Sequence, residues 1–357
     1  MFGEKKSDKA ELYRMFTIIY RYNVAGIGIV EALRAYNNNI EKEYVKEITE
    51  ELISTIESGV SFPDAMAKFP DFFPGYVIGL IRVGENSGEM SKILDEINMF
   101  LKQDIDMDRK IRSAMWVQKV FIVGIIFVLA MAVIFVIPQM GEVLENADIE
   151  LPLLTKAVLG FGRFCISFWY LIALIVGGIF FYLQHLKRNQ PEKYEWLKLR
   201  LPIFKDVYFY QLQYRFTKVF GICKDASVET IDAIDYSTMA VDNALFRMIM
   251  NNSVEEHKRT GMDIVSCIKK TDTYRVFDPS LFTMLAAGMG TANIGQIMLA
   301  ESEGYKKDLE AVLQVMGDKI GLSITIPGYI CLIILFAALE FPLFRLMDSV
   351  GKIGISG

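Results

Sequence analysis

Few residues in this chain could carry out chemistry on a small molecule. Its two histidines, His185 and His257, pair with no serine and form no H-E-x-x-H pattern, so neither a nucleophile–base pair nor a zinc site is expected. No G-x-x-x-x-G-K-[ST] loop is present to cradle a nucleotide phosphate. We therefore expect no catalytic residue, no metal and no cofactor. The cysteines lack C-x-x-C spacing and are expected to be inert thiols in a reducing compartment: Cys165, Cys223, Cys267 and Cys331.

A short polar motif is more informative than any catalytic pattern. Gly84-Glu-Asn-Ser-Gly88 has its serine one place too late for the G-x-S-x-G nucleophile motif. Two glycines around a polar tripeptide predict a tight turn between two helices. Glu85 in this motif has two interpretations. It either caps or pairs locally in the turn, or contacts a partner or a second protomer.

A second group of charges lies about twenty residues downstream. Asp104, Asp106 and Asp108 stand beside Arg109 and Lys110. We interpret this run as a solvated face near a membrane rather than as a cation site.

The motif has a degraded copy later in the chain. Leu80 to Met90 corresponds to Met284 to Ile294, which pairs Gly84 with Gly288 and Ser87 with Thr291. Further pairs precede it in the same order, with an offset that drifts only from 201 to 204 residues: Tyr13-Arg14 with Tyr214-Arg215, Glu31-Ala32-Leu33 with Asp232-Ala233-Ile234, Gly59 with Gly261, and Phe73 with Phe277. One module is used twice.

Apolar and charged residues are segregated along the 357-residue chain. Apolar residues make up 52% and charged residues 23%, and the mean hydropathy is positive. Three runs carry no charge: Val120 to Ile137, Phe164 to Leu183 and Ile320 to Leu339. At about 1.5 Å per residue each would extend roughly 27–30 Å, the thickness of a bilayer's hydrocarbon core. Three transmembrane helices are therefore predicted.

Lysine and arginine asymmetry predicts the orientation of these spans. Basic residues precede the first run and follow the second, whereas the loop between the runs is acidic, and no cleavable signal peptide opens the chain. The predicted segments are a first cytoplasmic helical bundle (1–116), a first span (117–138), a short periplasmic loop (139–163), a second span (164–184), a second cytoplasmic bundle (185–319), a third span (320–340) and a periplasmic tail (341–357).

Both copies of the module are predicted to be all-α, each a bundle of six helices. In the first copy helices are expected at 9–22, 29–36 and 41–57, then from Ser61 with Asp64 as its capping partner, up to Gly84, and from 87 to 112. The second copy should follow the same plan from 209 to 319. In both copies the last helix is expected to enter the membrane with little interruption.

These patterns resemble the type II secretion F family, which includes the inner-membrane platform proteins of type IV pili. The resemblance covers the whole chain and rests on Ala25-Gly26-Ile27-Gly28-Ile29-Val30-Glu31-Ala32-Leu33, Gly59-Val60-Ser61-Phe62 and Phe72-Phe73-Pro74 before Gly84-Glu85-Asn86-Ser87-Gly88. Its short N-terminus is most similar to the platform proteins of type IVb pili. The second copy departs from the pattern, with Met289 and Ala292 in place of the glutamate and the second glycine.

The resemblance implies a scaffold in the bacterial inner membrane rather than an enzyme. The implied partners are a cytoplasmic assembly ATPase, pilin subunits, other inner-membrane assembly proteins, membrane lipids and further copies of the chain; no nucleic acid is expected. The implied motif and contact residues are Gly26, Gly59, Phe73, Gly84, Glu85, Ser87 and Gly88, with repeat counterparts Ser227, Gly261, Phe277, Gly288 and Thr291. The platform of a type II secretion system is one alternative. A transporter is another, disfavoured because the three apolar runs contain no ionisable side chain.

Overall fold

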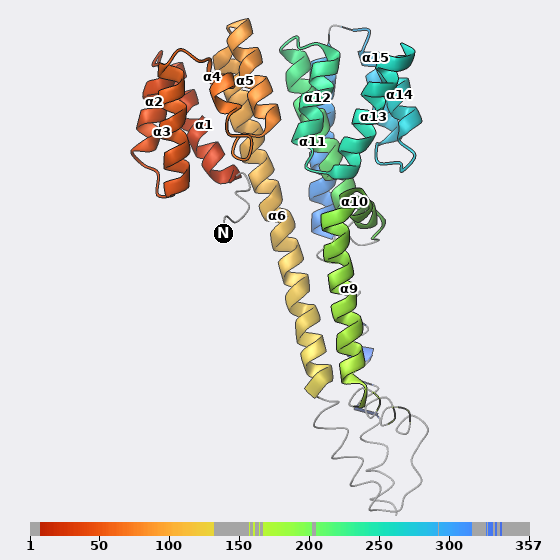
Figure 1. Cartoon of the computed structure of the whole chain (residues 1–357). Coiled ribbons are helices and arrows are strands. Elements are labelled where there is room, and N and C mark those ends of the chain that lie inside the picture. Colours follow the sequence, from red (N-terminus) through yellow and green to blue (C-terminus); the bar gives the residue numbers. More distant parts are fainter. Residues whose placement is uncertain are drawn as a thin grey trace, which may run out of the picture. The chain divides into compact units, whose positions relative to one another are not determined.

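The described part of the chain is helical throughout. The computed structural model describes residues 8–131, 167–201, 205–291 and 293–315, and isolated positions within 157–164 and 326–337. The all-α prediction is confirmed. The helices are α1 Lys9–Val24, α2 Ile29–Asn37, α3 Glu43–Glu57, α4 Phe62–Met66, α5 Gly75–Ser87, α6 Met90–Met131, α9 Trp169–Asn189, α10 Pro191–Arg200, α11 Lys205–Asp225, α12 Thr230–Ala240, α13 Ala244–Thr260, α14 Ile264–Thr271 and α15 Pro279–Gly288 (Figure 1). A further helix covers residues 294–315.

Helix α1 is stabilised by a side-chain cap at its N-terminus and by an apolar stripe that faces the core. The Asp8 carboxylate accepts hydrogen bonds from the backbone N–H groups of Ala10 and Glu11 and so caps α1. The apolar stripe that faces the core is fully buried; its members are Leu12, Met15, Phe16 and Ile19. The predicted cap of α4 is also present, since Ser61 accepts from the N–H of Asp64.

The predicted turn at residues 84–88 is placed differently in the structure. Gly84 lies inside α5, which continues through Ser87, and Gly88 alone ends the helix with a left-handed φ of 75°. Gly84 serves packing rather than turning, because a Cβ there would come 3.1 Å from the Cβ of Ile93 on α6. Glu85, Asn86 and Ser87 therefore form the last turn of α5.

Equivalent helices of the two copies begin at the spacing seen in the sequence. The separation is 201 residues for α2 and α12 (29 and 230) and for α3 and α13 (43 and 244), and 204 for α5 and α15 (75 and 279). The second copy ends its fifth helix earlier. Helix α15 ends at Gly288, with Met289 as its C-cap, whereas α5 continues through Glu85 to Ser87. Helix α10 precedes this copy and was not predicted.

Contacts divide the chain into two compact units. The first contains residues 1–111 and 191–312, and the second contains residues 112–190 and 313–357. Within the first unit the two copies of the module share an interface, where α5 packs against α12. The approach is close: a Cβ at Gly79 of α5 would lie 2.4 Å from the Tyr236 ring of α12.

Helix α6 belongs to both units. It runs without a break from Met90 to Met131, as predicted for the last helix of the first copy. In the described part of the chain, no helix combines the length and the hydropathy required of a membrane span. The first predicted span continues past Met131 beyond the described residues, which also exclude the loop 139–156, most of the third span and the tail 341–357.

Candidate functional site: the motif end and the ionic network

The motif turns of the first copy lie at one end of its bundle. Gly26, Gly59 and Gly88 follow α1, α3 and α5, and alternate connections of an up-and-down bundle share an end (Figure 1). All three have φ between 74° and 94°, a region that glycine adopts without steric cost. A hydrogen bond from Ser91 to Asn23 joins the end of α1 to the start of α6. We call this surface the motif end.

Glu85 stands exposed at the motif end. Its side chain forms no ion pair or hydrogen bond within the described chain, whereas nearby Arg82 pairs with Asp64 at 2.8 Å. A carboxylate in the last turn of a helix faces the negative end of the helix dipole, which is unfavourable by up to about 1 kcal/mol. Local capping or pairing therefore gives no account of the residue. Contact with a partner stays a prediction.

The second copy repeats the backbone of the motif end more than its chemistry. Ser227 and Gly261 occupy the positions of Gly26 and Gly59 and also have left-handed φ values, 61° and 68°. The Thr291 hydroxyl donates to the Gly288 carbonyl at 2.9 Å, and Ala292 lies outside the described residues. Gly288 again permits close packing, here with Ile294.

Phe73 and Phe277 are core residues rather than surface contacts. Phe73 is fully buried and its ring meets that of Phe72 edge-on at 4.8 Å. Phe277 is 2% exposed and lies 4.6 Å from Phe246 and 5.8 Å from Phe216 between ring centroids. Among the predicted motif residues, these two stabilise the bundles from inside.

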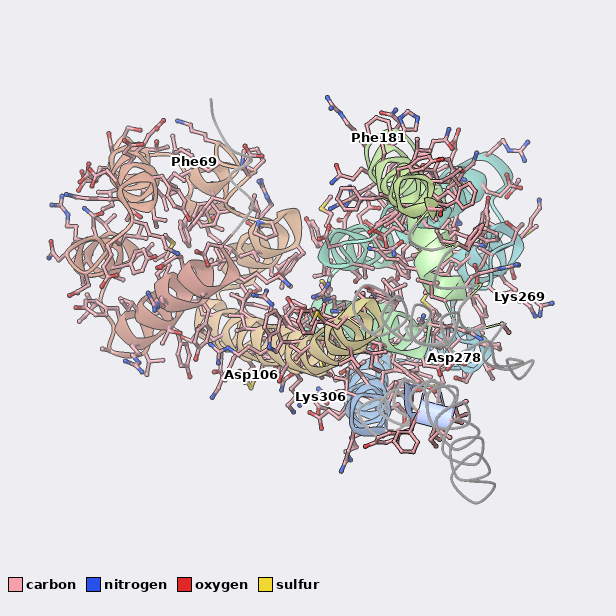
Figure 2. The ribbon with its side chains drawn as sticks, turned by 90° about the horizontal axis from the view of Figure 1, so that it is seen from below. Phe69, Asp106, Phe181, Lys269, Asp278 and Lys306 are labelled. Carbon is pink, nitrogen blue, oxygen red and sulfur yellow. The ribbon has the colours of Figure 1, made fainter. Side chains whose placement is uncertain are left out.

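The acidic run on α6 is not the solvated face that its sequence predicts. Asp106 does point outward, with about half of its side chain exposed (Figure 2). Asp104, in contrast, has a side chain that is 5% exposed, and Asp108 is about two-thirds buried. The interpretation was wrong because a carboxylate four residues from another shares its helix face, while one two residues away does not.

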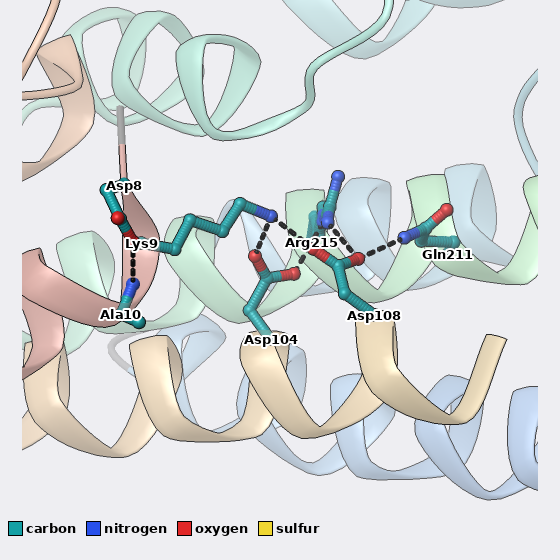
Figure 3. Close-up of polar contacts among 7 residues, drawn as sticks. All are labelled: Asp8, Lys9, Ala10, Asp104, Asp108, Gln211 and Arg215. Atoms are coloured by element: carbon teal, nitrogen blue, oxygen red, sulfur yellow. Dashed lines mark hydrogen bonds and ion pairs between the residues drawn. The ribbon is translucent and has the colours of Figure 1, made fainter. Parts of the chain in front are cut away.

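Asp104 and Asp108 form an ionic network that joins three helices. Lys9 Nζ on α1 lies 2.6 Å from Asp104 Oδ2 and 2.6 Å from Asp108 Oδ2. Arg215 on α11 donates through Nε to Asp104 Oδ1 at 2.7 Å and through Nη2 to Asp108 Oδ1 at 3.0 Å (Figure 3). Gln211 adds a hydrogen bond to Asp108 at 3.2 Å. The α6 network therefore ties the first helix of each copy to α6.

Burial makes this network expensive to break. Burial raises the pKa of Asp104, but the nearby charges of Arg215 and Lys9 outweigh it and hold that pKa below the ordinary 3.8. The Arg215 guanidinium is desolvated, yet Asp104 and Asp108 raise its pKa further above the ordinary value. Aromatic rings cover the pairs, and burial raises the pKa of Tyr76 and Tyr214 above the usual tyrosine range.

The alignment of the two copies was the one feature of the sequence that pointed to the ionic network. Arg215 is the counterpart of Arg14, which is two-thirds exposed and, among the described residues, pairs with Glu11 of its own helix. Equivalent arginines thus have different partners: Arg215 binds the α6 aspartates, whereas on α1 it is Lys9 that binds them. The repeat identified Arg14 and Arg215 as equivalent positions, but it predicted neither the partners of Arg215 nor its burial.

No catalytic arrangement emerges in the described residues. Histidines, cysteines and carboxylates there form no group of three that could hold a metal. Cys223 and Cys267 are free and buried, and burial raises the pKa of the Cys223 thiol to about 12, so it is unreactive near neutrality. His257 hydrogen-bonds the Met262 carbonyl, and His185 is exposed. Cys165 and Cys331 lie outside the described residues.

Comparison with known proteins agrees with this architecture. The family model for the type II secretion system protein F matches residues 17–138, which include the motif end and all of α6. The type IV pilus assembly protein PilC of Pseudomonas aeruginosa is 22% identical over 330 residues, covering 92% of this chain and 87% of the relative. The chain is thus similar to the type II secretion F family, by the family model over residues 17–138 and by relatives along most of its length.

Other relatives match over similar lengths. The type IV pilus assembly protein PilC of Thermus thermophilus is 26% identical over 332 residues, covering 91% of this chain and 80% of the relative. The type II secretion system protein F of Aeromonas hydrophila is 22% identical over 293 residues, covering 82% and 74%. Pilus and secretion proteins are thus both among the type II secretion F relatives of this chain.

Proposed function

We propose that this chain is the inner-membrane platform of a type IV pilus assembly machine. In this role it couples a cytoplasmic assembly ATPase to the insertion of pilin subunits into the growing filament. The proposal is supported by relatives named as pilus assembly proteins over nine-tenths of the chain. The chain itself would act as a scaffold without catalysis, and the energy would come from the ATPase.

The observation that carries the proposal is the continuity of α6. Its first turn lies at the motif end, its middle carries the ionic network, and its last part lies in the first charge-free run. A helix with an unbroken hydrogen-bond ladder moves as one element. A partner that displaces the motif end therefore displaces the C-terminal part of α6 as well.

Membrane insertion completes the proposed mechanism. The three charge-free runs would span the inner membrane, with the N-terminus and both bundles cytoplasmic and the C-terminus periplasmic. Large apolar side chains of α9 support this placement, since Leu174, Phe180 and Phe181 are 73%, 65% and 74% exposed and would otherwise contact water.

Cysteines placed at Asn146 and Ser356 should react with an impermeant thiol reagent in intact cells, and one at Asn38 should not. The reverse pattern would reject the orientation.

The partners would bind at different parts of the chain. The ATPase would contact the motif end through Glu85 and its neighbours, and pilins and other assembly proteins would meet the spans and the periplasmic segments. Further copies of the chain would complete an oligomeric platform. A second candidate is the equivalent platform of a type II secretion system, which the relatives named as secretion protein F support.

Partner capture tests the proposal and separates the two candidates. The full chain, carrying an affinity tag, is captured from its own bacterium after mild solubilisation, beside an untagged strain. We expect an assembly ATPase and pilins from a pilus operon; a secretion ATPase and secretion pseudopilins would identify the second candidate. Hydrolysis of ATP by the purified chain alone would contradict both.

A further inference from the structure

An unassigned cleft lies in the first unit, beside α10. Its volume is about 680 Å³, and it is lined mainly by cationic and aromatic side chains. Its cationic and aromatic lining residues are Trp196, Arg200, Lys205, Phe209, Tyr274 and Arg275. Neither the motif end nor the ionic network uses any of them.

The three cations of the cleft form no ion pair with any described carboxylate. Arg200, Lys205 and Arg275 are exposed, and none forms an ion pair with a carboxylate in the described chain, although 18 such contacts are present elsewhere in it. Three uncompensated positive charges around one cleft produce a field that attracts an anion.

Local structure positions the guanidinium of Arg200 and the backbone of Arg275. The Arg200 guanidinium lies 4.5 Å from the centroid of the Trp196 ring, within the range of a cation–π contact. Arg275 has a left-handed φ of 54°, held because the Asp272 carboxylate accepts hydrogen bonds from the backbone N–H groups of Val276 and Phe277. The cleft is thus formed by ordered elements.

The first copy carries the opposite charge at the equivalent loop. Residues 69–72 correspond to 273–276 and also line a cleft, of about 260 Å³, but there the charged side chains are chiefly Glu47, Glu51 and Asp71. Asp71 stands at the repeat position of Arg275. The positive cleft is therefore a property of the second copy alone and not of the repeated module.

We propose that the α10 cleft binds the headgroup of an anionic phospholipid. The cleft is connected to the apolar helix α9 by a very short link: α10 begins at Pro191, and α9 ends at Asn189. If α9 spans the membrane, as the proposed function requires, the cleft lies within reach of the cytoplasmic lipid surface. Cationic side chains bind the phosphate there, and Trp196 and Tyr274 are of the type that sits at headgroup level.

The test counts lipids bound to the purified full chain in detergent by native mass spectrometry. The probes are phosphatidylglycerol, phosphatidylcholine and soluble glycerol phosphate. Wild type should retain phosphatidylglycerol more strongly than the other two. Lys205→Gln/Arg275→Gln should weaken that binding about fivefold for each residue, which corresponds to about 1 kcal/mol per basic residue.

Matched controls isolate the cleft. Lys102→Gln/Lys258→Gln removes the same charge from two exposed lysines that do not line the cleft and should leave phosphatidylglycerol binding unchanged. Lys205→Gln alone, at an exposed helix start, replaces the double variant if that one fails to fold.

Three outcomes overturn the inference. They are equal retention of phosphatidylglycerol and phosphatidylcholine by wild type, equal loss in the cleft and control variants, and glycerol phosphate binding as strong as lipid binding. Failure here is separable from failure of the proposed function, because partner capture through the motif end does not depend on Lys205 or Arg275. Loss of a captured protein with unchanged lipid binding would assign the cleft to that protein instead.

Discussion

At the scale of single residues, the molecule distinguishes two arginines that its repeat treats as equivalent. Arg215 has a side chain only 10% exposed and donates to two aspartates, whereas Arg14 is exposed and pairs within its own helix. Removing one partner of a buried pair leaves an uncompensated charge, so the cost is far larger than at the surface.

Substitution of the two arginines measures this difference. Arg215→Met should lower the free energy of unfolding of the solubilised full chain by about 3 kcal/mol, since Asp104 then keeps only Lys9. Arg14→Met should cost less than about 1 kcal/mol. Denaturant titration followed by circular dichroism gives both values. Equal costs would mean that the network adds nothing to the interface between the copies.

The lowered pKa of Asp104 predicts a dependence of stability on pH. A carboxyl whose pKa is lower in the folded chain than in the unfolded chain stabilises the fold above its ordinary pKa, here 3.8, and loses that contribution as the pH falls toward the folded value. Wild type should therefore lose stability below about pH 4. The Asp104→Asn variant should be less stable than wild type at neutral pH, and its free energy of unfolding should change less with pH in the acid range. An unchanged acid slope in this variant would assign the effect to other carboxyls.

Glu85 is exposed, and its contact with a partner is a prediction that a charge reversal can test. Glu85→Lys should reduce filament assembly while leaving the level of the protein in the membrane near normal, because a change at an exposed side chain usually alters stability by no more than about 0.5 kcal/mol. Glu41→Lys, an equal charge reversal on the exposed α2–α3 connection, is the control and should assemble filaments normally. Loss of the Glu85 variant from the membrane would show that its role is structural.

At the scale of elements, the sequence predicted helices well where local signals and core faces coincide. Helix α1 was predicted at residues 9–22 and is present at Lys9–Val24, where its apolar stripe faces the core. The fifth helix was predicted to end at Gly84, because a glycine can mark either a turn or a close helix–helix contact. The close contact with Ile93, nine residues later, shows that Gly84 serves packing. Helix α10 was missed because its ten residues contain no buried side chain and so no periodic stripe.

The interface between α5 and α12 could not be predicted, because nothing local records it. Gly79 gives a direct test, since an added methyl would overlap the Tyr236 ring. Gly79→Ala should destabilise the full chain by about 1–3 kcal/mol. Gly304→Ala, in a helix with no atom within 4 Å of the new Cβ, should be neutral or slightly stabilising. A neutral Gly79→Ala would show that the two copies pack loosely.

At the scale of the whole molecule, the proposed role requires that work done on the cytoplasmic bundles reaches the spans. The two bundles are joined by the ionic network, and two described helices, α6 and the helix over residues 294–315, pass from the first unit into the second without interruption. The glycines of the motif end could be located from the sequence, because glycine adopts a positive φ without steric cost, and their role in partner contact stays a prediction. The connection of this site to α6 through Asp104 and Arg215 depends on tertiary contacts and could not be predicted.

The most direct test of this account breaks α6 while sparing both bundles. Seven Gly and Ser residues inserted between Ser113 and Ala114 lie beyond the end of the first unit at residue 111 and beyond the ion pair of Lys110 with Glu310. A seven-residue helical insert at the same place is the control, since two turns keep the helix continuous with only about 20° of rotation. We predict that the flexible insert abolishes piliation, counted by electron microscopy, while the captured ATPase is retained, and that the helical insert still supports pili. Normal piliation with the flexible insert would contradict mechanical coupling through α6.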